Sequence, residues 1–271
     1  MTLPFILRAG TKARAQISQS GFDADSLAAF GAPAGGPKFI IQSHLDRFLF
    51  SQWLPQRKQA LPAFGSSIGA FRLLAAAHRD PAAAAERLYQ AYCQQNYENK
   101  PTATDISREV NKILHALLQA DDMDYILHHP WLQLNLLTTR CLGLAAARQP
   151  AWQAIGFALA FASNLRARRR LATRFERCVF QNHSAAAPVL APDAFATHTT
   201  RLTRENLAPV TLASGTIPLL METVRDIPQA PAGAHIDGGM IDYHIDLPLH
   251  VPQADAGILF IPHYEQREVR G

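Results

Sequence analysis

The sequence has little that would indicate a secreted, membrane-spanning or disulfide-stabilised protein. Its 271 residues include 3 cysteines, none in a C-x-x-C or C-x-x-H arrangement, which argues against a disulfide framework and a thiolate zinc site. Residues 1–16 lack the long apolar run and cleavage site of a signal peptide. The longest apolar tract, at 154–165, is too short for a spanning helix. We therefore expect reduced, buried cysteines and a cytoplasmic protein.

Charge is also sparse, and this limits the classes of partner. Charged residues make up 18% of the chain and hydrophobic residues 48%, a composition typical of a globular protein with a sizeable core. The net charge of +4 is too small to indicate nucleic-acid binding by itself. No internal repeat or low-complexity tract is present. We expect a single domain over 1–271 that binds no nucleic acid.

The order of apolar runs predicts an α/β fold. Two strand-turn-helix units come early, with strands in "DSLAAFGAP" and "ALPAFGSS", and this repetition favours a mostly parallel sheet. Residues 80–180 read as amphipathic helices, with Thr104 as a cap, and predict a large helical insertion. After His183 the pattern changes to short β-like runs, which include "APVTLASG", "AGAHIDGGM" and "AGILFIPHY".

A G-x-S-x-G frame lies between the second predicted strand and the helix after it. Gly65 and Gly69 frame Ser67, and Ser66 occupies the variable position. In a strand-to-helix turn this spacing exposes the serine hydroxyl above the sheet, so Ser67 is the candidate nucleophile. The alternative is an ordinary turn in which the serine caps the helix.

Two pairs of glycines could assist acyl-transfer chemistry. Gly35 and Gly36 precede a predicted helix start, where backbone N–H groups could stabilise an oxyanion. In "HIDGGM", Asp237 is followed by Gly238 and Gly239, which would allow the aspartate to approach a serine closely. A simple βα turn and a hairpin turn, respectively, remain the alternative interpretations.

Taken together, these segments resemble the patatin-like phospholipase family. The order of glycine-rich loop, G-x-S-x-G and D-G-G is similar to that family, and "ASGTIPLLM" resembles its A-S-x-A-x-P block. The resemblance spans roughly residues 26–239, although its specific residues are confined to these short segments. It implies a three-layer α/β/α fold and hydrolysis of lipid esters, of the phospholipase A or lysophospholipase type, without a metal or organic cofactor.

The resemblance also implies roles for individual residues. Ser67 corresponds to the nucleophile and Asp237 to the base of a serine–aspartate dyad. The backbone N–H groups of Gly35, Gly36 and Ile68 would hold the oxyanion. Lys38 matches the basic residue after the glycine loop; Gly65, Gly69, Gly238 and Gly239 complete the motifs.

The sequence departs from the family pattern in the glycine loop. Pro33, Ala34 and Phe39 replace an aspartate and two glycines, and Thr216 replaces an alanine in the later block. These changes motivate a second hypothesis, a catalytically degenerate homologue that binds a lipid or a protein. The chain also ends soon after a strand-like run, as expected of a short or truncated family member.

The histidines provide the main chemical alternative. A serine-histidine-aspartate esterase would place its histidine after the acid, where His244, His250 and His263 are available. Metal ligation by His128, His129 or His235 is less favoured, because no further ligands suggest themselves.

The apolar tract at 154–165 runs into an arginine-rich segment at 166–177. One interpretation is contact with the surface of a membrane, in which arginines meet lipid phosphates and apolar side chains enter the interface. The other is a buried helix with a solvated basic end, and we favour it because apolar residues cover almost every face.

Overall fold

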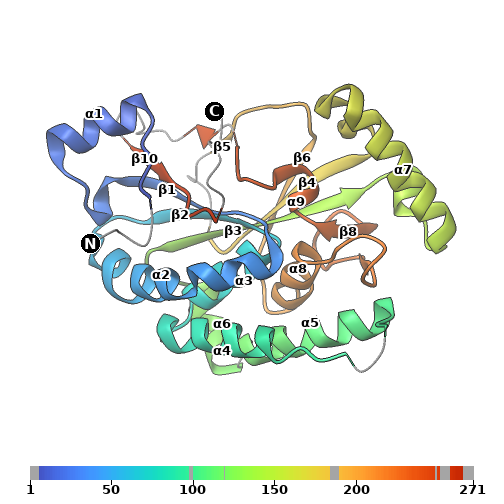
Figure 1. The fold of residues 1–271 in the computed structure, drawn as a ribbon, viewed down its shortest axis with the longest axis horizontal. Helices are drawn as coiled ribbons and strands as arrows, with labels where there is room; N and C mark the ends of the chain where they lie inside the picture. Colours follow the sequence, from blue (N-terminus) through green and yellow to red (C-terminus); the bar gives the residue numbers. More distant parts are fainter. Residues whose placement is uncertain are drawn as a thin grey trace.

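A computed structural model describes residues 6–97, 100–118, 120–183, 189–247, 249–250 and 257–264. The chain has a mixed α/β fold in which helices flank a mostly parallel, 8-stranded sheet (Figure 1). This architecture confirms the predicted three-layer α/β/α class. The end of the chain, where the sequence suggested truncation, lies outside the described residues from position 265 onward.

Parallel pairing dominates the part of the sheet that carries the G-x-S-x-G frame. The strand order is β10-β1-β2-β3-β4-β6, with β8 paired to β3 and to β7. β10, β1, β2 and β3 run parallel, whereas β4 and β8 run antiparallel to β3. The strands are β1 (Leu27–Ala32), β2 (Leu61–Ser66), β3 (Leu132–Cys141), β4 (Phe175–Gln181), β5 (Val189–Leu190), β6 (Thr197–Arg201), β7 (Val224–Arg225), β8 (Ala234–Asp237), β9 (Leu249–His250) and β10 (Ile258–Phe260).

Most helices gather on one face of the sheet. In Figure 1, α2 to α6 and α8 lie together below it, whereas α7 stands apart at the right, beyond the carboxyl end of β3. No helix in the described ranges is both long and apolar enough to cross a membrane. The helices are α1 (Thr11–Ser20), α2 (Ser43–Phe48), α3 (Ile68–Ala76), α4 (Pro81–Cys93), α5 (Ala103–Leu117), α6 (Ala120–Leu127), α7 (Pro150–Arg166), α8 (Leu207–Ser214) and α9 (Gly239–Asp242).

The prediction of helices throughout 80–180 is confirmed for α7 (Pro150–Arg166) but wrong where two strands lie. α4, α5 and α6 are helices as expected, but β3, a central strand of the sheet, and β4 lie inside the same range. β3 packs Leu134 and Leu136 into the main core and Leu137 into the core on the opposite face. A strand that is buried on both faces has a continuous apolar sequence, and periodicity cannot distinguish that from a buried helix.

Two smaller expectations also need correction. The run "APVTLASG" was expected to be β-like, but it lies in α8, whose Val210 and Ala213 pack into the main core. Short apolar runs are ambiguous between the two structures. The N-cap of α5 is Thr102 rather than Thr104, and its side chain forms a reciprocal capping box with Asp105.

The crossing of α3 over β1 and β2 has no room for side chains at two positions. A Cβ on Gly65 would lie 2.8 Å from the carbonyl oxygen of Gly69, and a Cβ on Gly69 would collide with the carbonyl oxygen of Ala32. The glycines of the G-x-S-x-G frame are therefore required by the close approach of backbone to backbone.

We predict that Gly69→Ala lowers the free energy of unfolding by about 2 kcal/mol or more, because the obstructing atoms belong to backbone that cannot rotate away. The matched control is Gly10→Ala, since a Cβ at Gly10 would meet nothing within 4 Å. Urea denaturation of both variants measures the difference. Equal stability of the two variants would contradict this account of the crossing.

Candidate functional site

The turn between β2 and α3 holds Ser67 in a strained backbone conformation. Ser67 has φ 56° and ψ −131°, a region that residues with a side chain rarely adopt. It is the N-cap of α3, but its side chain makes no capping hydrogen bond. The hydroxyl is therefore directed to another partner, which argues against the interpretation of Ser67 as an ordinary helix cap.

Sheet topology brings Asp237 to this turn. β2 and β8 pair with the same side of β3 and run toward each other, so that their carboxyl ends meet. Ser66, at the end of β2, pairs with Leu137, and Asp237, at the end of β8, pairs with Thr138, the next residue of β3. The hydroxyl of Ser67 donates a hydrogen bond of 2.5 Å to Oδ2 of Asp237. The two predicted dyad residues are in direct contact.

The carboxylate of Asp237 is buried without a counter-charge. Its side chain forms no ion pair with any described residue, and the residue is 8% exposed. Burial raises the pKa of Asp237 to about 6, although hydrogen bonds from Ser67 and from the N–H of Gly239 act in the opposite direction. A carboxylate with this pKa is a stronger base than an ordinary aspartate and still loses its proton near neutral pH.

The "ASGTIPLLM" segment fixes both members of the pair. The hydroxyl of Ser214 accepts the N–H of Ser67 at 3.0 Å and donates to the carbonyl of Leu137 at 2.7 Å. The carbonyl of Thr216 accepts the N–H of Asp237 at 3.0 Å. The resemblance pointed to this segment, but only the structure gives its residues a positioning role.

The glycine loop lies beside the pair and is partly covered. Ala34 faces Gly239, because a Cβ on Gly239 would be 2.8 Å from that of Ala34. A Cβ on Gly35 would collide with the ring of Tyr264, whose hydroxyl donates to the carbonyl of Ala34. Gly36 has φ 53°, a conformation that favours glycine.

The remaining predicted residues take different positions around the loop. Ile68 is the first residue of α3, so its backbone N–H has no acceptor within the helix and is available at the turn. The ammonium of Lys38 lies 5.0 Å from the ring centroid of Tyr264, in a cation-π contact. Gly238 must be glycine, because a Cβ there would meet the carbonyl of Leu137.

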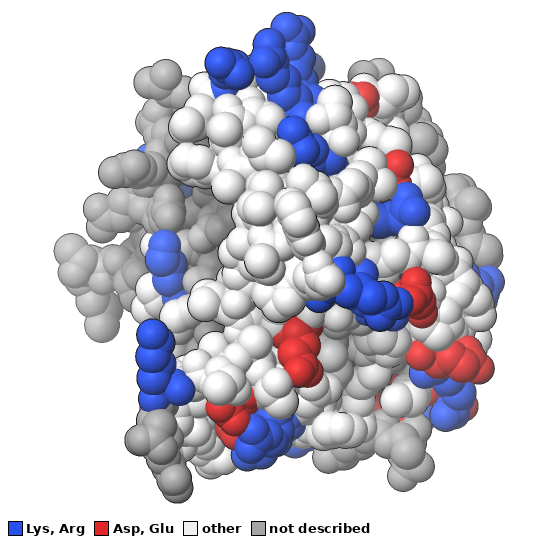
Figure 2. All heavy atoms as spheres, turned by 90° about the vertical axis from the view of Figure 1, so that its right-hand side faces the viewer, with Lys and Arg blue, Asp and Glu red and all other residues white. Residues whose placement is uncertain are grey.

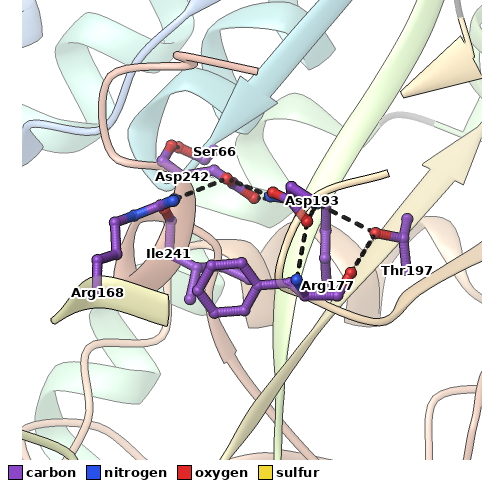
Figure 3. Close-up of polar contacts among 8 residues, drawn as sticks. Ser66, Arg168, Arg177, Asp193, Thr197, Ile241 and Asp242 are labelled. Atoms are coloured by element: carbon purple, nitrogen blue, oxygen red, sulfur yellow. Dashed lines mark hydrogen bonds and ion pairs between the residues drawn. The ribbon is translucent and has the colours of Figure 1, made fainter. Parts of the chain in front are cut away.

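A buried cluster of ion pairs holds the segment that follows Asp237 (Figure 3). Arg177 on β4, 1% exposed, donates to both carboxylate oxygens of Asp242 at 2.6 and 2.9 Å. It also donates to Asp193 at 2.8 and 3.2 Å. The hydroxyl of Ser66 donates to the backbone carbonyl of Asp242 at 2.9 Å. The guanidinium of Arg168 lies 3.6 Å from the side-chain carboxylate of Asp242.

This cluster ties α9 to β2 and β4. Burial acts to lower the pKa of Arg177, but its hydrogen bonds to the carboxylates of Asp242 and Asp193 outweigh burial and raise that pKa, so the guanidinium stays charged. The sequence analysis placed Arg177 in a basic segment that is solvated or meets lipid phosphates, which is wrong for this buried residue, and it assigned no role to Asp193 or Asp242. A single arginine in a strand gives no signal of this kind until the strand is known to be internal.

The histidines take other partners. His244 and His263 lie 3.0 Å apart, nitrogen to nitrogen, and His235 lies near Thr138 and the carbonyl of Pro231. The side chain of His250 lies outside the described part of the chain. The contact between Ser67 and Asp237 is direct, with no imidazole between them. Within the described ranges, no group of three or more histidine, cysteine or acidic side chains is arranged to hold a metal ion.

Comparisons with models of protein families, with curated proteins and with solved structures found no match for this chain. The likeness to patatin-like phospholipases therefore rests on the motifs quoted above. The contact between Ser67 and Asp237 is an independent observation, because it follows from the topology of the sheet and not from the motifs alone.

We predict that Asp237→Asn stabilises the protein at alkaline pH. Folding raises the pKa of Asp237 to about 6, so the folded protein binds this proton more tightly than the unfolded chain does. The resulting contribution to the free energy of unfolding is lost as pH rises from about 4 to 6. Asparagine keeps the shape without the buried charge. The free energy of unfolding of the variant should exceed that of the wild type by on the order of 2 kcal/mol at pH 8 and equal it at pH 4. Denaturant unfolding at both pH values measures this, and a constant difference would contradict the shift.

Proposed function

We propose that this protein is a serine acyl hydrolase that cleaves carboxylic esters of lipids and is related to the patatin-like phospholipases. The observation that carries the proposal is the 2.5 Å hydrogen bond from the hydroxyl of Ser67 to Asp237, at a strained strand-to-helix turn. A hydroxyl paired with a buried carboxylate of raised pKa is the arrangement that nucleophilic catalysis requires.

In the proposed reaction, Oγ of Ser67 attacks the acyl carbonyl while Oδ2 of Asp237 accepts the hydroxyl proton. The tetrahedral intermediate collapses to an acyl-enzyme as Asp237 returns this proton to the leaving alcohol. Water, deprotonated by Asp237, then attacks the acyl-enzyme, and the proton passes back to Ser67. No metal or organic cofactor takes part in these steps.

The oxyanion would be stabilised by backbone N–H groups at the turn. Ile68 offers the first N–H of α3, and the loop at Gly35 and Gly36 lies beside the same turn. The ring of Tyr264 occupies the place where a side chain on Gly35 would lie, so it narrows the space for substrate at this loop.

A lipid substrate is favoured by apolar side chains next to the dyad. Ile217, Leu219 and Leu220 are 47%, 48% and 55% exposed. They directly follow Thr216, the residue whose carbonyl holds the N–H of Asp237. Exposed aliphatic side chains in the segment hydrogen-bonded to Asp237 fit a substrate with long acyl chains better than a small, polar ester.

We predict that Ser67→Ala abolishes both labelling by a fluorophosphonate probe and hydrolysis of short acyl esters, with a loss of roughly a thousandfold or more. The matched control is Ser66→Ala, which removes the neighbouring hydroxyl and its hydrogen bond to the carbonyl of Asp242 but leaves the proposed nucleophile. Mass spectrometry of the labelled peptide locates the adduct. An adduct on Ser66, or undiminished turnover without Ser67, would overturn the assignment.

The proposed base also sets the pH dependence. Because burial raises the pKa of Asp237 to about 6, kcat/KM should rise about tenfold per pH unit below pH 6 and level off above it. Ester hydrolysis across pH 4 to 8 measures this profile. Activity that depends on His244 or His263 but survives Asp237→Asn would support a serine-histidine-aspartate triad instead.

A non-catalytic lipid-binding role is the second candidate. The contact of Tyr264 with the glycine loop favours it, because a closed oxyanion site would bind without turnover. Complete inertness of Ser67 toward fluorophosphonates, with retained binding of fatty acyl ligands, would support this role. For either role we propose a cytoplasmic location, in keeping with free cysteines at positions 93, 141 and 178.

A further inference from the structure

Helix α7 is built with most of its large apolar side chains facing outward. The residues that it buries fully are Gln153, Gly156 and Ala160, which are small or polar, and of its large apolar side chains Phe157 packs inward, against Phe175. A Cβ on Gly156 would collide with the backbone at Ala145, which shows how closely the inner face packs. The exposed residues are the large ones: Trp152 51%, Ile155 44%, Leu159 41%, Phe161 65% and Leu165 73%. The sequence-based preference for a buried helix is wrong.

The charged residues of α7 and of the segments directly before and after it have one sign. Residues 143–175 contain no aspartate or glutamate, and their arginines are Arg148, Arg166, Arg168, Arg169, Arg170 and Arg174. Arg166, Arg169 and Arg170 are exposed at the carboxyl end of α7. Figure 2, which faces the side of the molecule where α7 lies, shows a broad area without charged side chains and a group of basic side chains at its upper edge.

Helix α7 and the segment after it contact the segments on either side of the candidate dyad. Gln153 donates to the hydroxyl of Thr223, which follows the exposed apolar residues 217–220. Arg168, just beyond the helix, contacts the carbonyl of Ile241 in α9 and the carboxylate of Asp242. These contacts join α7 to the segment that carries the apolar residues, and join Arg168 to α9, which follows Asp237.

We propose that the outer face of α7, with the arginines that follow it, docks on the surface of an anionic lipid bilayer. The apolar side chains would enter the interface, with the helix in the plane of the membrane, and Arg166, Arg169 and Arg170 would meet lipid phosphates. Exposure of this much aromatic and aliphatic surface to water is unfavourable unless a partner covers it.

Charge complementarity favours a bilayer over a second copy of the chain. A symmetric dimer through this face would bury the apolar residues, but residues 143–175 offer no carboxylate to pair with the arginines of the other copy, and Asp226 and Asp242 nearby already pair with Arg148 and Arg168. An anionic bilayer supplies phosphates along its whole surface. The proposal does not depend on catalysis, so it can be tested in protein that lacks the nucleophile.

The apolar contribution is tested by vesicle flotation in a Ser67→Ala background, with mixed phosphatidylcholine–phosphatidylglycerol vesicles. The double variant Phe161→Ser/Leu165→Ser should bind at least about tenfold more weakly. The matched control is Ile41→Ser, because Ile41 is 74% exposed but lies outside the proposed surface. Unchanged binding by the double variant, or an equal loss with the control, would overturn the proposal.

The electrostatic contribution is tested with Arg166→Gln/Arg169→Gln/Arg170→Gln. Each basic residue near an anionic surface contributes about 1 kcal/mol, so this variant should bind roughly a hundredfold more weakly, and wild-type binding should weaken as salt increases. Lys12→Gln/Arg14→Gln, on the exposed helix α1, is the charge control. Equal binding to pure phosphatidylcholine would contradict an anionic partner.

The orientation of the helix is tested through Trp152. Acyl chains brominated near the interface should quench the fluorescence of the Ser67→Ala protein, and Trp152→Phe should remove most of that quenching, since Trp53 and Trp131 are not exposed. Persistent quenching in Trp152→Phe would place another part of the chain in the membrane. Self-association without lipid that Phe161→Ser/Leu165→Ser abolishes would identify a second copy as the occupant and overturn the proposal.

Discussion

The geometry of the candidate site depends on the buried ion pairs that Arg177 makes with Asp242 and Asp193. A buried arginine is costly unless carboxylates neutralise it and satisfy its donors, and here two do so at once. The pairing locks α9 against β4, and the hydroxyl of Ser66 ties the same turn to β2. Asp237 lies directly before this turn, so these contacts support the position that the pairing of β8 with β3 gives it.

The same cluster explains why two nearby carboxylates differ in character. Asp242 faces a guanidinium, whereas the carboxylate of Asp237 lies just outside the cluster and, among the described residues, accepts hydrogen bonds from a hydroxyl and a backbone N–H only. Without a counter-charge, burial raises the pKa of Asp237 to about 6. A shift of Arg168 or Arg177 toward Asp237 would remove the basicity that the proposed chemistry requires.

Local motifs were predictable because each is required by a short-range constraint. Gly65 and Gly69 are needed where backbones cross, and β1, β2, β8 and β10 were expected as short runs bounded by turn residues. β3 was missed because an internal strand is apolar on both faces and reads like a buried helix. The prediction for α7 was wrong for a different reason. Most of its large apolar residues face outward, and hydrophobicity alone does not reveal which face of a helix packs against the protein.

The sequence by itself determined the chemistry available to this chain: a serine between glycines, an aspartate before two glycines, and a basic, apolar helix. Local spacing and steric limits suffice for that, since they act over a few residues. Only the tertiary structure decided which groups meet. Ser67 and Asp237 come together because β2 and β8 converge beside β3 from distant parts of the chain. Such pairing depends on long-range strand register, which no local pattern encodes.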